Sequence, residues 1–169
     1  MFKYSVPQTP QTTPPVTDLN ASPIQPPTTH YTADPSGSTA LHIAAKKGHL
    51  GIVQLLLDTG IQINSLDRDS NSCLHLAVTS GNTAMVKLLL SNGADCNLPD
   101  GVGKTALHLA AEGGSVEMVR VVMDRMGSLD ERDGMGRTAL HAAAEGGFED
   151  IVLAMLVGGV NSRVNVLEW

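Results

Sequence analysis

The stretch Asp100-Gly101-Val102-Gly103-Lys104-Thr105-Ala106-Leu107-His108 is one copy of a pattern that recurs along the chain. Its last four residues reappear as Thr39 to His42, Ser72 to His75 and Thr138 to His141, so that successive histidines lie 33 residues apart. An aspartate stands five positions before each Thr or Ser, and a glycine stands six positions after each His. Three markers in register at one period identify an internal repeat.

Each unit of the repeat is predicted to contain two helices followed by a turn-rich link. Thr39 precedes an apolar stretch and can cap a first helix, which Gly48 then ends. A second apolar stretch, Ile52 to Leu57, is closed by Gly60. The links between units are rich in Asn, Asp and Gly, which suits tight turns. One helix pair cannot cover its own apolar face, so the units are expected to stack as an all-α solenoid.

The pattern resembles the ankyrin repeat. The resemblance rests on the Asp-x-x-Gly-x-Thr-x-Leu-His block and on the unit ending Gly93-Ala94-Asp95-Cys96-Asn97. It implies helix-turn-helix units with β-hairpin-like loops over residues 34 to about 163. Ala or Cys stands where the family usually has proline, and the pattern degrades after Val160.

The register divides the chain into segments. Repeats are predicted at residues 34–66, 67–99, 100–132 and 133–163, with a divergent end to the fourth and a C-terminal tail at 164–169. Eight of the nine prolines lie at or before Pro35, interleaved with Thr, Gln and Ser. Such a composition buries too little apolar surface to offset its ordering entropy. Residues 1–33 are therefore predicted to be a disordered Pro/Thr-rich tail.

Composition argues against several classes of partner. A formal charge of −6 and a pI near 5.4 are unsuited to binding nucleic acid directly or to binding an anionic membrane surface. The longest apolar run, Ile151 to Val160, is shorter than the roughly 20 residues of a membrane span, so it is expected to be a core helix. Cys73 and Cys96 form no paired motif and are interpreted as reduced thiols. These features predict an intracellular monomer, in the cytoplasm or the nucleus.

Three patterns resemble ligand sites but lack the geometry or the residues that such sites need. The histidines in register lie on helices that pack about 8–10 Å apart, too far to share a zinc ion. Gly-Lys-Thr at 103–105 resembles the end of a phosphate loop, but Leu98 occupies the place of its first glycine. Asp67, Asp69 and Asn71 imitate a calcium loop that Ser72 and Val78 do not complete. No enzyme, cofactor or metal is predicted.

Structural roles are expected for the paired residues of the repeated block. Thr and His at positions i and i+3 share a helix face and can form a hydrogen bond. The ankyrin resemblance implies that each His also connects adjacent repeats. The residues concerned are Thr39, His42, Ser72, His75, Thr105, His108, Thr138 and His141.

A partner-binding surface is expected on the concave side, because the resemblance places it at the hairpin tips and at the ends of the first helices. The residues there differ between repeats while the frame is constant, which is typical of a binding surface on a scaffold. By register they are Ser36, Ser38, Lys46, Lys47, Arg68, Asp69, Asn71, Thr79, Ser80, Val102, Lys104, Glu112, Met135, Arg137 and Glu145.

The charges on this surface are predicted to be graded. Lys46 and Lys47 stand at the end of a first helix, where positive charge is favourable, whereas Glu112 and Glu145 occupy equivalent places with the unfavourable sign. The sequence thus predicts a basic first repeat and acidic third and fourth repeats.

The favoured function is an intracellular adaptor or regulator that binds a protein partner. The alternative is a transcriptional or signalling regulator of the kind found in fungi, in which a basic region precedes four such repeats. Here residues 1–33 contain Lys3 as their one Lys or Arg, so direct DNA binding is not expected.

Overall fold

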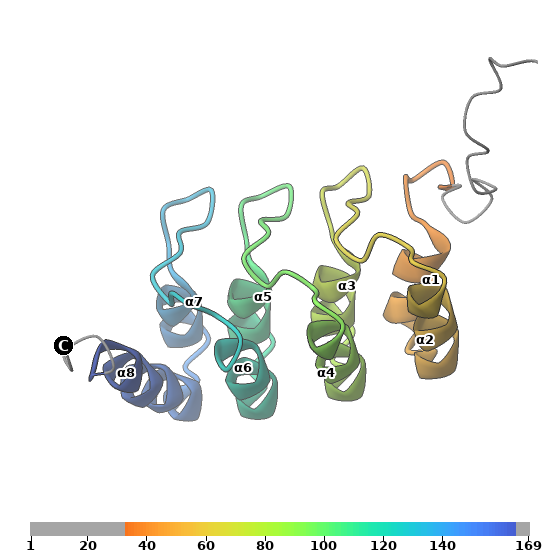
Figure 1. Cartoon of the computed structure of the whole chain (residues 1–169). Helices are drawn as coiled ribbons and strands as arrows, with labels where there is room; N and C mark the ends of the chain where they lie inside the picture. The colour runs from red at the N-terminus through yellow and green to blue at the C-terminus, as the bar shows by residue number, and fades with distance from the viewer. Residues whose placement is uncertain (1–32, 165–169) are drawn as a thin grey trace, which may run out of the picture.

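A computed structural model describes residues 33–164, and in this part of the chain eight helices stack as four pairs (Figure 1). The prediction of an all-α solenoid is confirmed. The tails predicted at residues 1–33 and 164–169 lie, except for residues 33 and 164, outside the described residues. The helices are α1 (Ala40–Lys47), α2 (Leu50–Asp58), α3 (Cys73–Thr79), α4 (Thr83–Ser91), α5 (Ala106–Glu112), α6 (Val116–Met123), α7 (Ala139–Glu145) and α8 (Glu149–Val164).

The first helix of every pair begins at the repeated Thr or Ser. Thr39 has an extended backbone, and its side chain and backbone N–H both face the imidazole of His42. At its other end α1 stops at Gly48, whose φ of +77° is the left-handed conformation that favours glycine. The repeated Thr and Gly therefore mark the two ends of the same short helix.

The repeated aspartate closes the loop that projects in front of each first helix. In all four loops its Oδ1 accepts hydrogen bonds from the backbone N–H groups two and four residues later, at 2.8–3.0 Å. Within the described residues the extended pairing is limited to a single bridge between Leu66 and Ser72. The loops are thus hairpin-like turns held by a carboxylate rather than β-sheet.

Adjacent loops are joined by one backbone hydrogen bond each. The N–H groups of Arg68, Gly101 and Gly134 donate to the carbonyls of Ser36, Asp69 and Val102, at 2.9–3.1 Å. The approach is close: a Cβ atom added to Gly134 would lie 2.6 Å from the Val102 carbonyl oxygen. The row of loop tips in Figure 1 is therefore a hydrogen-bonded ladder.

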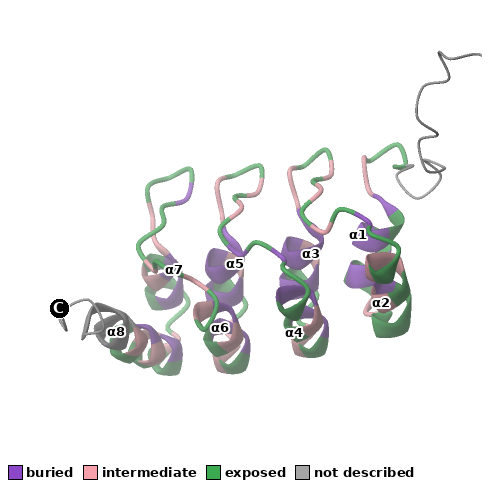
Figure 2. Ribbon diagram, viewed as in Figure 1, coloured by how far each residue is buried: buried purple, intermediate pink, exposed green. Residues whose placement is uncertain are grey.

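The core is aliphatic and continuous through the stack. Leu41, Leu74 and Leu107, from equivalent positions of three repeats, are almost completely buried. Alanines on the same helices, such as Ala45 and Ala111, are buried as well, and their small side chains let neighbouring helices pack closely. Figure 2 shows the buried faces turned toward neighbouring helices and the loops mainly exposed at their tips.

His42 and His108 each connect their repeat to the next through Nε2. His42 Nε2 lies 3.1 Å from the Asn71 carbonyl oxygen, and His108 Nε2 lies 3.0 Å from that of Arg137. His75 Nε2 lies 3.0 Å from the Leu98 carbonyl oxygen, at the end of its own repeat. Because Nδ1 accepts a backbone N–H in each case, these geometries require a neutral ring with its proton on Nε2.

The fourth repeat departs from the expected pattern. His141 faces Thr138 like its counterparts, but it is exposed, because no described element stacks beyond it. The expectation of a tie from His141 to a following repeat is therefore wrong for this part of the chain. In addition, α8 continues to Val164, and of its apolar residues only Ile151 and Met155 are buried among those whose side chains are described. The prediction that the whole run is core is also wrong.

Removing the His108 side chain should destabilise the stack. His108→Ala leaves the Thr105 N–H without its acceptor and removes one of the two hydrogen bonds to the Arg137 carbonyl, which keeps the bond from the Asp133 N–H. The free energy of unfolding should therefore fall by about 1–3 kcal/mol. His141→Ala is the matched control, because this ring is exposed and keeps only its contacts with Thr138. Denaturant titration measures both. Equal losses for the two variants would contradict the assigned role of His108.

Acidification should weaken the fold through His75. Burial lowers the pKa of His75 below its ordinary value. The folded state then binds fewer protons than the unfolded state, so the free energy of unfolding should fall as the pH drops below about 6.5. Denaturant midpoints between about pH 7.5 and 5.5 test this. A His75→Gln variant should show a shallower slope, and an identical slope would contradict the assignment.

Candidate functional site

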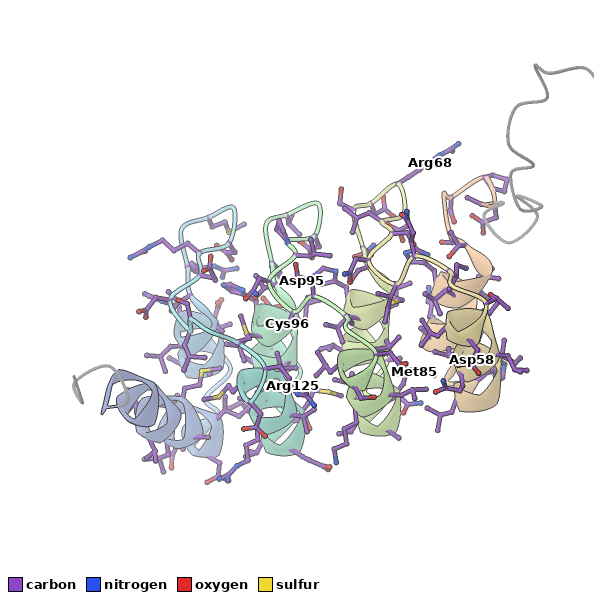
Figure 3. The ribbon with its side chains drawn as sticks, viewed as in Figure 1. Asp58, Arg68, Met85, Asp95, Cys96 and Arg125 are labelled. Carbon is purple, nitrogen blue, oxygen red and sulfur yellow. The ribbon has the colours of Figure 1, made fainter. Side chains whose placement is uncertain are left out.

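The four loop tips and the adjacent ends of the first helices form one continuous surface, here called the concave surface (Figures 1 and 3). Of the fifteen residues predicted for it, eleven are exposed, and Ser38, Asn71, Lys104 and Arg137 are half-buried. Arg68 projects outward from the tip of the second loop in Figure 3. The structure thus brings residues from four separate segments onto one accessible face.

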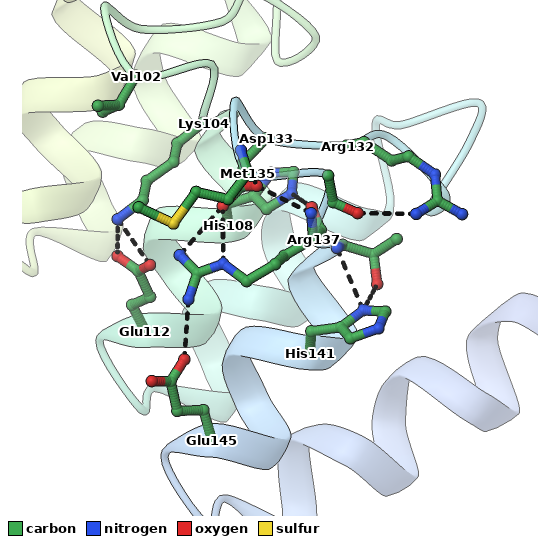
Figure 4. Close-up of polar contacts among 12 residues, drawn as sticks. Val102, Lys104, His108, Glu112, Arg132, Asp133, Met135, Arg137, His141 and Glu145 are labelled. Carbon is green, nitrogen blue, oxygen red and sulfur yellow. Dashed lines mark hydrogen bonds and ion pairs between the residues drawn. The ribbon is translucent and has the colours of Figure 1, made fainter.

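In the third and fourth repeats this surface carries two ion pairs (Figure 4). Lys104 Nζ lies 2.7 Å from Glu112 Oε1, and Arg137 Nη1 lies 2.9 Å from Glu145 Oε2. Arg137 also contacts the buried carboxylate of Asp133 at 3.1 Å. Each pair links the loop of a repeat to the end of its own first helix.

These pairs partly neutralise the predicted acidic end of the surface. Glu112 and Glu145 each have a cation of the same repeat at ion-pair distance, although Arg137 is shared between Glu145 and Asp133. The pairs also explain why glutamate is tolerated at a helix C-terminus: the loop cation offsets the unfavourable interaction with the helix dipole. Reversing either glutamate should therefore lower the stability rather than leave it unchanged.

The first two repeats differ, because their cations on the concave surface have no such partners. No carboxylate within the described residues lies at ion-pair distance from Lys46, Lys47 or Arg68. The nearby carboxylate of Asp34 accepts hydrogen bonds from the Ser36 hydroxyl and the Ser38 N–H, which lower its pKa, and the more distant charge of Arg68 lowers this pKa further. The concave surface therefore carries free positive charge at its N-terminal end.

Apolar side chains occupy the loop tips at the other end. Ser36 and Asp69 are followed in register by Val102 and Met135, which are 61% and 76% exposed. In Figure 4 the Met135 side chain is drawn between Lys104 and Arg137, while Val102 lies apart from the two ion pairs. Because the neighbouring charges are already paired with each other, a partner can cover these apolar loop tips without burying an unpaired charge.

Other chemistry has little support among the described residues. No group of three His, Cys, Asp or Glu side chains in this part of the chain could hold a metal ion. Burial raises the pKa of Cys73 to about 12, and burial likewise raises the pKa of Cys96. Their Sγ atoms donate to the carbonyls of Ile63 and Arg125. Neither thiol is activated as a nucleophile.

Sequence reasoning missed the ion pairs. The partners are eight residues apart and separated by the start of a helix, so no helical spacing rule links them. One signal was available: Lys104 and Arg137 share a register position, and so do Glu112 and Glu145. Only the repeats with a cation at the first of these positions have a glutamate at the second, and this co-occurrence could have suggested that the two side chains form an ion pair.

Stacked helix pairs with projecting loops define a helical repeat protein of the scaffold type. A family model described as "Ankyrin repeats (3 copies)" matches residues 24–100 and 98–166. The chain therefore belongs to the ankyrin repeat family. A comparison with curated proteins gives no match. Among the described residues, no helix is long and apolar enough to cross a membrane.

The Lys104–Glu112 pair should contribute measurably but weakly to stability. A double-mutant cycle with Lys104→Met and Glu112→Gln should give a coupling of about 0.2–1 kcal/mol that decreases with salt. Lys46→Met with Glu112→Gln is the control, because these residues form no ion pair with each other. Urea titrations at two salt concentrations measure the coupling. An equal coupling in both cycles would show that the pair does not form in solution.

Proposed function

We propose that this chain is a non-catalytic module that binds a protein partner through the concave surface. The main support for the proposal is that the structural hydrogen bonds are the same in every repeat, whereas the residues at the loop tips differ. The Asp, Thr and His contacts repeat from unit to unit, whereas the tips read Ser36, Asp69, Val102 and Met135. Ankyrin repeats are generic protein interaction modules, which agrees with this function.

The distribution of side chains favours a partner with two kinds of contact. Acidic residues would lie opposite Lys46, Lys47 and Arg68, which lack carboxylate partners. Apolar side chains would lie opposite Val102 and Met135. Charge at the rim would mainly set the association rate and the orientation, while the apolar contacts would slow dissociation.

This function is an adaptor or regulator acting inside the cell, in the cytoplasm or the nucleus, as a monomer. The fungal type of transcriptional regulator is less favoured, because residues 1–33 contain Lys3 as their one Lys or Arg and so form no basic region before the repeats. An enzyme is least favoured, because the cysteines are not activated as nucleophiles and His42 and His108 form structural hydrogen bonds to backbone carbonyls.

Selection from a displayed library of random short peptides tests the proposal. The full chain should enrich peptides that combine acidic and apolar residues. Lys46→Glu with Lys47→Glu should weaken the enriched peptides at low salt, and Val102→Ser with Met135→Ser should speed their dissociation. Lys87→Glu is the control, since Lys87 lies on α4 and pairs with Glu117 of α6.

Fluorescence anisotropy with the enriched peptides measures both effects. The proposal fails if no peptide is enriched, or if the enriched peptides respond to Lys87→Glu and not to the concave substitutions. Helical content measured in parallel distinguishes lost binding from lost folding.

A further inference from the structure

The fourth repeat carries apolar residues at two positions where the other repeats are polar. In register, the position of Leu153 is occupied elsewhere by Gln54, Lys87 and Arg120. The position of Val157 is occupied elsewhere by Asp58, Ser91 and Asp124. Since these positions are four residues apart on a helix, they share one face. The fourth repeat therefore exposes apolar side chains where the other three repeats carry polar ones.

Both residues remain accessible and line a groove. Leu153 is 60% exposed and Val157 is 62% exposed. With Met123 and Val116 of α6 they form the apolar wall of an open groove of about 600 Å³ between α6 and α8. Its rim carries Arg120, Asp124 and Asp150. The groove lies on the second helices, away from the loop tips (Figure 1).

The size of the apolar surface decides what can occupy the groove. A stable contact between two protein surfaces generally buries about 800 Å² on each partner, contributed by roughly 20–30 residues. The groove has nine lining residues, and Leu153 and Val157 are its only largely exposed apolar ones. It is therefore too small for a second copy of the chain, but it suits one large side chain on a short segment.

We propose that the α6/α8 groove is a binding site for an aromatic side chain, and that Trp169 occupies it. Asn165-Val166-Leu167-Glu168-Trp169 follows α8 directly and lies outside the described residues. Five extended residues span at most about 17 Å, whereas Val157 precedes Val164 by about 10 Å of helix. The indole can therefore reach Val157 if the segment turns back along α8.

The rim of the groove suits the polar groups of this segment. A buried indole N–H needs an acceptor, and the carboxylates of Asp124 and Asp150 border the groove. Arg120 forms no ion pair with the described residues, so it is available to the Glu168 carboxylate next to the tryptophan. The segment thus supplies an apolar group for the wall and a charge for the rim.

Trp169 is the single tryptophan, so its fluorescence reports directly on the site. In the full chain its emission should be blue-shifted, and its quenching by acrylamide should be several-fold weaker than in the synthetic peptide Asn-Val-Leu-Glu-Trp. Leu153→Arg with Val157→Asp copies Arg120 and Asp124 of the third repeat, so the helix should tolerate it. This variant should bring both values to those of the peptide.

Leu55→Arg is the matched control, because Leu55 is an equally exposed apolar residue on α2 of the first repeat, at 69%. It should leave the emission unchanged. If the double variant loses helicity, Val157→Asp alone replaces it as the groove variant. Peptide-like quenching in the unaltered chain would overturn the proposal, and so would shielding that survives both groove variants. Shielding that appears only as protein concentration rises would also overturn it, since a second copy would then cover the site.

Discussion

The imidazole Nε2–H bonded to a backbone carbonyl is the contact on which the stack depends. The same ring accepts a backbone N–H at Nδ1, so one side chain fixes the start of its own helix and holds a loop of the stack. This double use requires the neutral tautomer, which burial favours at His75. Where no following repeat exists among the described residues, at His141, the ring keeps its cap and loses its burial.

This arrangement separates the frame from the surface. The aspartate, threonine and histidine contacts lie within the loop bases and helix starts, so the loop tips are free to vary with little effect on folding. Stability in such an array is the sum of repeat terms and nearest-neighbour interfaces. The concave surface could therefore acquire free lysines at one end and Val102 and Met135 at the other. The ion pairs at Glu112 and Glu145 reduce the free negative charge at the second end.

The repeat, its helices and the concave positions could be predicted from the sequence, because each depends on contacts that are local or recur at a fixed period. The Thr39 cap and the Gly48 stop are examples. The charge balance could not, since Lys104 meets Glu112 only after the loop folds back over the helix end. The exposure of Leu153 and Val157 was also missed, because an apolar run indicates burial only where a neighbour covers it. The helix position of Glu112 indicates an unfavourable charge, because that position alone does not show the cation of the loop.

Residue-by-residue amide hydrogen exchange tests most directly the claim that neighbouring repeats hold one another in place. Protection should be greatest in α3 and α5, which have a repeat on either side, and lower in α1 and α7. The amides of Gly101 and Gly134, which donate to the preceding loop, should exchange as slowly as helix amides. Uniform protection across the four repeats, or fast exchange at these two glycines, would contradict the account.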